Sequence, residues 1–422
     1  MEQVQKIILP NGIVLLYEHI EHIRSILLGT WVSRGSRHES SQEQGLAHFL
    51  EHMLFKGSSR RNSKEIAHSL EAVGGDINGF TSRDNCCYYA KATMDHVELV
   101  FDVISDLVLH PKLLEEEMLR EKQVICQEID MVNDSHEELV HDTVLRALYE
   151  EPLAHPVIGT KESVQRFSHE QLIGFYKKFY HPENLFITIV GNLDSVDVET
   201  LAMQYFQKSY NIEDELSSLP NKDRDKIQNL AIHKSTEQCH SIFAWRSFPI
   251  DHPDRYVLHL INAHLGGGMS SVLFQELREE AGLVYNTYSF IRAYSDTGFF
   301  GVYCGYHPQS ASELIQRLSE LMQKFVAEGL EGTRLQQLKE QLKGSLLLGL
   351  EKTSFRMNRM SVGHMHFQRI ISTDELIEMV NSIQVSDINR VSKEIFNGPV
   401  GCINVGPLEQ EEWDQLTQGA FQ

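Results

Sequence analysis

His48-Phe49-Leu50-Glu51-His52 is the stretch on which the fold and the chemistry of this chain depend. Residues four apart on a helix lie one turn apart and only about 40° out of line, so the two imidazoles share one face. Such a pair is suited to bind a zinc ion. Glu51 lies three residues after His48, near enough in angle to reach a water on the metal without being a ligand. We expect it to act as a general base.

The composition is that of a soluble globular protein, with 41% hydrophobic and 23% charged residues. A chain of 422 residues is expected to form about two to three domains. It contains no apolar run long enough to cross a bilayer, which excludes a membrane span. The first residues, 1–17, have neither the pattern of a secretory signal nor that of an Arg-rich presequence. We therefore expect a cytoplasmic protein.

The formal net charge of -21 argues against nucleic-acid binding, which requires basic patches that neutralise phosphates. The acidity could favour basic partners, or it could serve only to keep the protein soluble, and the sequence leaves both readings open. The cysteines form no C-x-x-C pair and are expected to be buried thiols of a reducing compartment. They are Cys86, Cys87, Cys126, Cys239, Cys304 and Cys402.

Strands and helices are predicted in mixed order around the histidine pair. Pro10-Asn11-Gly12 indicates a tight turn, and Asn62 with Glu65 is typical of a helix capping box. The expected elements are a hairpin over Ile7–Tyr17, strands over Ile26–Val32, Asp76–Thr81 and Cys87–Thr93, a helix from Asn62 to Gly74, an amphipathic helix over His96–Leu109 and a helix-favouring stretch over Leu113–Tyr149.

Two stretches of the first part of the chain recur later at nearly the same offset. The apolar pattern of Leu99–Val108 matches Glu313–Met322, where 313 minus 99 gives an offset of 214. Val190–Asp194 matches Val405–Glu409 at an offset of 215. Two well separated matches at nearly one offset indicate a tandem duplication with a period of about 200 residues, rather than a short-period solenoid.

We therefore expect residues 1–210 to form one half, 211–226 a polar linker, and 227–422 a related second half. Strand pairs joined by short turns among helices favour the α+β class, with a mostly antiparallel or mixed sheet and packed helices in each half. The second half has no H-x-x-E-H. His259 and His264 are five residues apart, about 140° around a helix, so only the first half is expected to carry metal.

A catalytic zinc usually has three protein ligands and one open position. The third ligand must therefore come from elsewhere in the fold, and Glu128 is a candidate. Glu121 lies seven residues earlier, two helical turns back on the same face, and could orient a ligand or the water. The residues alone do not choose Glu128 from the other acids of this stretch.

The extended motif His48-Phe49-Leu50-Glu51-His52-Met53-Leu54-Phe55-Lys56-Gly57, with Glu128 following 76 residues after His52, resembles the signature of a known family. This is the pitrilysin, insulinase and mitochondrial processing peptidase family of zinc metallopeptidases, of the inverzincin type. The length is similar to that of the short, dimer-forming branch close to processing peptidase β subunits and their bacterial relatives. Further matching stretches are Leu9–Gly12, Gly74–Arg83, Leu265–Ser271 and Leu277–Tyr285.

The resemblance implies His48, His52 and Glu128 as ligands of one Zn²⁺ per chain, Glu51 as the base, and Glu121 as an accessory carboxylate. It also implies two halves that face each other around a chamber, a homodimer, and extended peptides as substrates. From this we expect a zinc endopeptidase. The alternative is a non-catalytic structural or processing partner of the same fold, and a purely structural zinc protein is disfavoured because three ligands and a base describe an open site.

For substrate binding, the resemblance implies that the strand containing Asn78, Gly79, Phe80 and Thr81 pairs with an extended peptide by β-augmentation. Many relatives have Ala where this chain has Gly79, and glycine loosens an edge strand, so the detail of this pairing is open.

The resemblance also implies that Arg278 and Tyr285 contact substrate near the scissile bond. An Arg and a Tyr could equally hold the interface between the halves.

Overall fold

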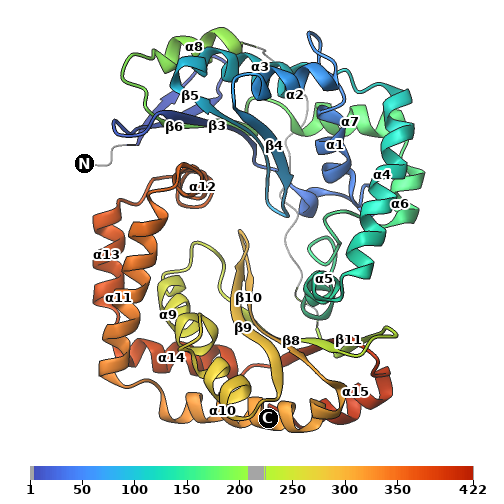
Figure 1. The fold of residues 1–422 in the computed structure, drawn as a ribbon, viewed down its shortest axis with the longest axis vertical. Coiled ribbons are helices and arrows are strands. Elements are labelled where there is room, and N and C mark those ends of the chain that lie inside the picture. Colours follow the sequence, from blue (N-terminus) through green and yellow to red (C-terminus); the bar gives the residue numbers. More distant parts are fainter. Residues whose placement is uncertain (1–3, 208–222, 224, 422) are drawn as a thin grey trace. The chain divides into compact units, whose positions relative to one another are not determined.

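Strand β3 lies inside a six-stranded sheet of order β1-β2-β6-β3-β5-β4 in the computed structural model, which describes residues 4–207, 223 and 225–421 (Figure 1). β2 pairs with β6 in parallel, and every other neighbouring pair is antiparallel. The sheet is therefore mixed, as expected. Its strands are β1 (Gln5–Ile8), β2 (Val14–His19), β3 (Ser25–Val32), β4 (Asp76–Thr81), β5 (Cys86–Thr93) and β6 (Leu185–Gly191).

Helices pack on this sheet because its inner strands are apolar on both faces. Ile26 and Leu28 of β3 join the core formed with most of the helices, whereas Leu27 and Trp31 point to the opposite face. The helices of this unit are α1 (Leu46–Leu54), α2 (Ser63–Glu71), α3 (Val97–Leu109), α4 (Glu115–Asp134) as far as Ile129, α6 (Lys161–Arg166), α7 (His169–Phe179), α8 (Val198–Tyr205) and α12 (Thr353–Val362), with the 3₁₀ turns η1 (Ser36–His38) and η2 (Met94–His96) and the π-helix η5 (Gly363–Phe367).

A second sheet has the order β7-β11-β8-β10-β9. It repeats the plan of the first sheet without the hairpin partner β1, because β7 pairs with β11 in parallel and the remaining pairs are antiparallel. This common topology confirms the expectation of two related α+β halves. The strands are β7 (Leu230–His233), β8 (Cys239–Ser247), β9 (Val284–Ala293), β10 (Gly298–Tyr306) and β11 (Val400–Gly406).

The second sheet is also covered by helices, and its largest core cluster includes the buried Trp245 and Trp413. Among the residues that the structure describes, no helix is both long and apolar enough to cross a membrane. The helices are α5 (His136–Leu148), α9 (Arg255–Gly266), α10 (Ala311–Glu328), α11 (Gly332–Gly349), α13 (Thr373–Ser382), α14 (Val385–Phe396) and α15 (Gln410–Thr417), with the π-helix η3 (Phe274–Glu280) and the turn η4 (Pro308–Ser310).

The two compact units exchange one segment each, so they differ from the sequential halves 1–210 and 227–422. Asp130–Ala154 belongs to the second unit, where α5 packs on β8 and β11. Leu348–Ser372 belongs to the first unit, where α12 packs on β3 and β6 (Figure 1). Each exchanged helix covers the sheet face that the other helices leave open.

Specific contacts secure both exchanged segments. In the first unit the sulfur of Met357 fills the space above Gly29, and Arg356 forms an ion pair with the buried Glu18. In the second unit the guanidinium of Arg246 donates to the carbonyl of Leu148 at the end of α5. The expected boundary segment 211–226 lies outside the described residues except for 223, 225 and 226.

The local expectations are confirmed, and the structure adds one detail. β1 and β2 form the hairpin, and Gly12 adopts the positive φ of 91° that its turn requires. The helix-favouring stretch 113–149 forms two helices, α4 and α5. The break falls at Ser135, whose hydroxyl accepts from the backbone N–H of Glu138 and so starts α5.

Candidate metal centre

Helix α1 places His48, Glu51 and His52 on its exposed side because its apolar residues face the core. The helix begins at Gly45, whose φ of 90° is in the left-handed region. Its first turn is held by Glu39, a fully buried carboxylate that accepts from the backbone N–H groups of Gly45 at 2.8 Å and Ala47 at 2.7 Å. The core-facing residues are Leu46, Ala47, Phe49, Leu50, Met53 and Leu54.

Glu128 comes from α4 and meets the two imidazoles. Its Oε1 lies 3.7 Å from Nε2 of His48, and its Oε2 lies 3.5 Å from Nε2 of His52. Within the described residues, these three side chains are the one group of His, Cys, Asp or Glu whose ligand atoms all lie within 4.8 Å of one another. The structure thus brings together the three residues that the sequence analysis named as ligands.

The spacing of these atoms fits a zinc ion better than a set of hydrogen bonds. Distances of 3.5 and 3.7 Å are too long for good hydrogen bonds. Two ligands about 2.1 Å from one zinc, at a tetrahedral angle, are about 3.4 Å apart. Two imidazoles and one carboxylate are also a donor set of catalytic zinc sites, and they leave a coordination position open.

The pKa of His48 agrees with a ligand role, because a metal binds the neutral ring. Burial lowers the pKa of His48 to about 3, and the neighbouring His52 acts in the same direction, so its ring is neutral near pH 7. In the described part of the chain, the buried Nδ1 of His48 has no hydrogen-bond partner. Burial also opposes a charge on His52, but its hydrogen bond to Glu121 and the nearby carboxylates outweigh burial and raise the pKa of that ring.

Glu121 contacts His52 and does not belong to the three-residue cluster itself. Its Oε1 lies 2.8 Å from Nδ1 of His52, and only 3% of the side chain is exposed. A carboxylate can only accept, so Nδ1 of His52 donates, and the lone pair of the ring is then on Nε2, which faces Glu128 and His48. The second oxygen of Glu121 lies 2.6 Å from Nζ of Lys56.

Glu51 is held by the edge strand of the sheet. Its Oε2 accepts from the hydroxyl of Thr81 on β4 at 2.5 Å. Burial raises the pKa of Glu51, although the hydrogen bond from Thr81 acts in the opposite direction. A carboxylate with a raised pKa is better able to hold a proton near pH 7, as a general base must. Thr81 was expected to bind substrate, and its side chain here positions Glu51.

The other residues of the expected substrate strand differ in their surroundings. β4 is an edge strand, paired with β5 on one side. Asn78 is exposed, and its side chain accepts from the backbone N–H of Gly79. A Cβ on Gly79 would lie 3.2 Å from the ring of Phe55 and 3.3 Å from the side chain of Glu51. Phe80 packs edge-on against the core.

Arg278 and Tyr285 lie together in the second unit, on η3 and β9. The guanidinium carbon of Arg278 is 5.7 Å from the ring centroid of Tyr285 and 4.8 Å from that of Phe274. Tyr285 is 76% exposed, which is high for an aromatic side chain. Both His259 and His264 lie on α9, and neither belongs to a metal-binding group among the described residues.

The sequence analysis gave no role to two residues that shape this site. Lys56 lies four residues after His52, and this spacing could have indicated a shared helix face. Glu39 gave no recognisable signal. It lies six and eight residues before the N–H groups that it binds, whereas a capping box has a spacing of three.

Comparison with known proteins identifies similar sequences over almost the whole chain. Residues 14–161 match the family described as Insulinase (Peptidase family M16), and residues 166–342 match the Peptidase M16 inactive domain. A protein of Bacillus subtilis named uncharacterized zinc protease YmxG is 32% identical over 94% of this chain and 97% of its own length. An uncharacterized zinc protease of Mycobacterium leprae is also 32% identical, over 96% of this chain and 92% of its own length.

Solved structures share the fold. The crystal structure of a protease from Helicobacter pylori matches with a TM-score of 0.90 and 21% sequence identity, over 96% of this chain and 100% of that chain. A Pseudomonas fluorescens structure described as a peptidase M16 inactive domain matches with a TM-score of 0.85 and 19% identity, over 96% of this chain and 98% of that chain.

Proposed function

This chain belongs to peptidase family M16, and we propose that it is a zinc-dependent endopeptidase of the H-x-x-E-H type that cleaves extended peptides. The observation that carries the proposal is the convergence of His48, His52 and Glu128, with Glu51 on the same helix face. A bound zinc would supply a Lewis acid for the scissile carbonyl and would lower the pKa of the attacking water.

Glu51 is the residue that moves the proton. Its Oε2 is engaged by Thr81, so Oε1 is the oxygen available to accept a proton from the attacking water. The same carboxyl group then passes the proton to the leaving amine. The hydrogen bond from Thr81 restrains the carboxylate in this position, and Gly79 leaves room beside Oε1 because it has no Cβ.

The edge strand β4 supports the choice of an extended peptide as substrate. An edge strand presents free backbone N–H and C=O groups, and a peptide that adds to it gains affinity from the main chain. We extend the proposal to Asn78, Gly79, Phe80 and Thr81 as the segment that pairs with the peptide. The chamber, the homodimer and the cytoplasmic location remain predictions from the sequence.

Arg278 and Tyr285 complete the proposed set of substrate-contacting residues. Tyr285 is exposed and the side chain of Arg278 is 40% exposed, and a guanidinium and a phenol can stabilise a carbonyl or a developing oxyanion. Tyr285→Phe removes only a hydroxyl group, so it should lower turnover without changing zinc content or thermal stability. Unchanged turnover in this variant would remove Tyr285 from the catalytic set.

The decisive experiment separates the base from the ligands. Glu51→Gln keeps all three ligands, so zinc content should stay near one ion per chain while peptide hydrolysis falls by about 10²-fold or more. Glu128→Gln should lose zinc. Glu116→Gln, on an exposed acid of the same helix α4, is the matched control and should change neither property.

The same experiment tests the alternative of a non-catalytic partner. A wild-type protein that holds zinc and cleaves no member of a broad peptide library would favour that alternative. Equal zinc content and equal activity in Glu51→Gln and wild type would contradict the assigned role of Glu51.

A further inference from the structure

Lys56 follows α1 directly and reaches back to the metal centre. It lies four residues after His52, and its backbone N–H still bonds the carbonyl of Met53, so it continues the helical turn. Its ammonium lies 2.6 Å from Oε2 of Glu121. Oε1 of the same carboxylate lies 2.8 Å from Nδ1 of His52. One buried carboxylate therefore joins the lysine to a metal-binding imidazole.

Both contacts are needed to satisfy Glu121. Its side chain is only 3% exposed, so water cannot replace a lost partner at low cost. A buried carboxylate with one oxygen unbonded tends to rotate or to take up a proton. Either change disturbs the acceptor that keeps the proton of His52 on Nδ1 and the lone pair of that ring on Nε2.

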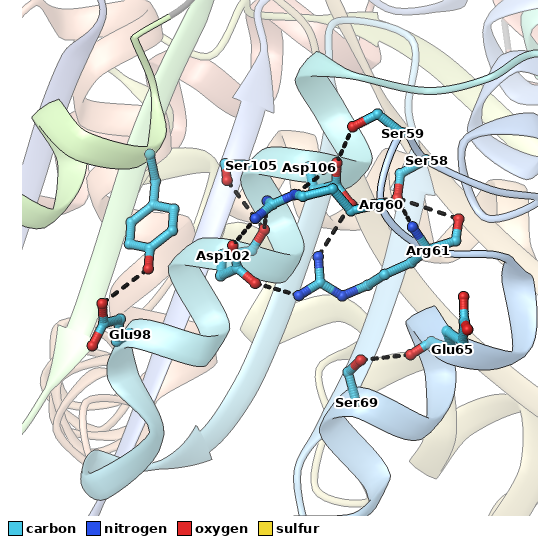
Figure 2. Close-up of polar contacts among 11 residues, drawn as sticks. Ser58, Ser59, Arg60, Arg61, Glu65, Ser69, Glu98, Asp102, Ser105 and Asp106 are labelled. Carbon is cyan, nitrogen blue, oxygen red and sulfur yellow. Dashed lines mark hydrogen bonds and ion pairs between the residues drawn. The ribbon is translucent and has the colours of Figure 1, made fainter.

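The backbone that carries Lys56 is itself anchored. The residues after Gly57 turn sharply and bind the carboxylates of α3, as Figure 2 shows. The hydroxyls of Ser58 and Ser59 donate to Asp106, which is fully buried, and Arg61 donates to the same carboxylate at 3.1 Å. Arg60 pairs with the neighbouring Asp102.

This cluster, formed by residues 58–61 with Asp102 and Asp106, restrains the start of the loop and thereby the origin of the Lys56 side chain. Two backbone hydrogen bonds also restrain this loop, because the carbonyl of Gly57 accepts from the N–H of Lys112 and the N–H of Ser59 donates to the carbonyl of His110. The lysine side chain is long and flexible by nature, but here its first atom and its last atom are both fixed.

We propose that Lys56 is a positioning residue of the metal centre, which holds Glu121 so that His52 presents Nε2 to the metal. The inference rests on the proposed zinc site and adds a residue to it. The observed contact of the Lys56 ammonium is with Glu121, so its effect is transmitted through that carboxylate.

Orientation and charge make opposite predictions for the removal of Lys56. By Coulomb's law alone, removing a cation near a Zn²⁺ site should strengthen zinc binding. If the lysine instead positions Glu121, its removal should weaken zinc binding, by about 10- to 100-fold as for other groups that orient a metal ligand. The sign of the change in zinc affinity therefore distinguishes positioning of Glu121 from electrostatic repulsion.

The test measures zinc affinity of the full-length chain by competition with a chromophoric chelator, without any peptide substrate. Lys56→Met should weaken zinc binding by about 10- to 100-fold, and Lys56→Arg, which keeps a charged donor, should recover most of it. Lys64→Met removes an exposed lysine of α2 and is the matched control, with affinity expected to stay unchanged. Should Lys56→Met fail to fold, Lys56→Gln carries the same prediction.

A double-mutant cycle tests the route through Glu121. In a Glu121→Gln background, Lys56→Met should change zinc affinity by less than about twofold. The inference is overturned if Lys56→Met loses the same zinc affinity with and without Glu121, or if Lys56→Met binds zinc more tightly than wild type. If the wild-type chain itself binds no zinc, the proposed function fails. If it binds zinc and Lys56→Met binds it equally well, only the role of Lys56 fails.

Discussion

Removal of the Glu39 carboxyl group is predicted to loosen the helix that carries the proposed zinc ligands His48 and His52. Glu39 is fully buried and accepts from the backbone N–H groups of Gly45 and Ala47, in the first turn of α1. These donors have no partner within the helix, because the first four N–H groups of any α-helix lack one. A residue outside the helix therefore does what an N-cap side chain usually does.

The magnitude follows from the number of bonds lost. Glu39→Ala leaves two buried N–H groups unpaired, at about 1–3 kcal/mol each, so the free energy of unfolding should fall by about 2–6 kcal/mol. Water that enters the vacated space would bring the loss toward the lower end, near the value for an N-cap side chain. Glu39→Gln keeps one acceptor oxygen and turns an amide N–H toward the other donor, so it should lose about half as much.

The dependence on pH gives an independent check. Burial raises the pKa of Glu39 to about 8, although the hydrogen bonds from Ala47 and Gly45 act in the opposite direction. The unfolded chain loses this proton near pH 4.5, the ordinary value. Stability from the bound proton is thus fully present below about pH 4.5 and is lost as the pH rises to about 8, at about 1.4 kcal/mol per pH unit. Glu39→Gln should lack this contribution.

The assay is urea unfolding of the metal-free protein between about pH 5 and about pH 8, with hydrogen exchange of peptides that cover α1. Glu71→Gln is the control, because Glu71 is an exposed acid at the end of α2. Its effect should stay within about 0.5 kcal/mol. The reasoning is refuted if Glu39→Ala is as stable as this control with α1 equally protected, or if wild type and Glu39→Gln share one pH slope.

Three further predictions concern the base, the anchored loop and the exchanged segment. Gly79→Ala should lower turnover without loss of zinc, because the new Cβ would lie 3.3 Å from the side chain of Glu51. Peptide hydrolysis and zinc content, measured on the same sample, check this. Asp106→Asn should lower the free energy of unfolding by about 3–5 kcal/mol, because the carboxylate is fully buried and paired. Asp102→Asn should lower it by only about 1 kcal/mol, and urea unfolding of the two variants checks the difference. Residues 1–210 expressed alone should aggregate, because they lack Leu348–Ser372, which belongs to the same unit. Joining that segment to 1–210 by a flexible linker should restore solubility. The prediction is contradicted if 1–210 alone is folded by circular dichroism and soluble by gel filtration.

Contacts within one helix turn were predictable from the sequence alone. His48, Glu51 and His52 lie on one helix, and their shared face follows from the 3.6-residue period. Contacts between distant segments were not predictable in this way. Glu128 lies 76 residues after His52, and many acids of α4 have similar local surroundings in the sequence, so its choice came from the family resemblance.

The exchange of segments also lies beyond what periodicity can indicate. The patterns of α5 and α12 predict amphipathic helices, but both sheets offer an apolar face of similar character. Which face each helix covers depends on pairs such as Met357 above Gly29, which become apparent only in three dimensions. The break between α4 and α5 was missed because Ser135 is a weak signal inside a stretch that contains neither Pro nor Gly.

His48 and His52 of the candidate metal centre are held in different ways, because helix α4 makes polar contacts with both nitrogens of one ring and with only one nitrogen of the other. Glu121 and Glu128 are seven residues apart on α4, so both lie on one face. They meet the two nitrogens of His52, Nδ1 and Nε2 respectively. His48 meets Glu128 at Nε2 only, and within the described residues its Nδ1 has no partner. The ring of His48 is therefore oriented by the packing of α1 in the core, and that of His52 by polar contacts from α4. If the proposed zinc binds both rings at once, its affinity should depend on the core packing of α1 and on the Lys56–Glu121 pair together.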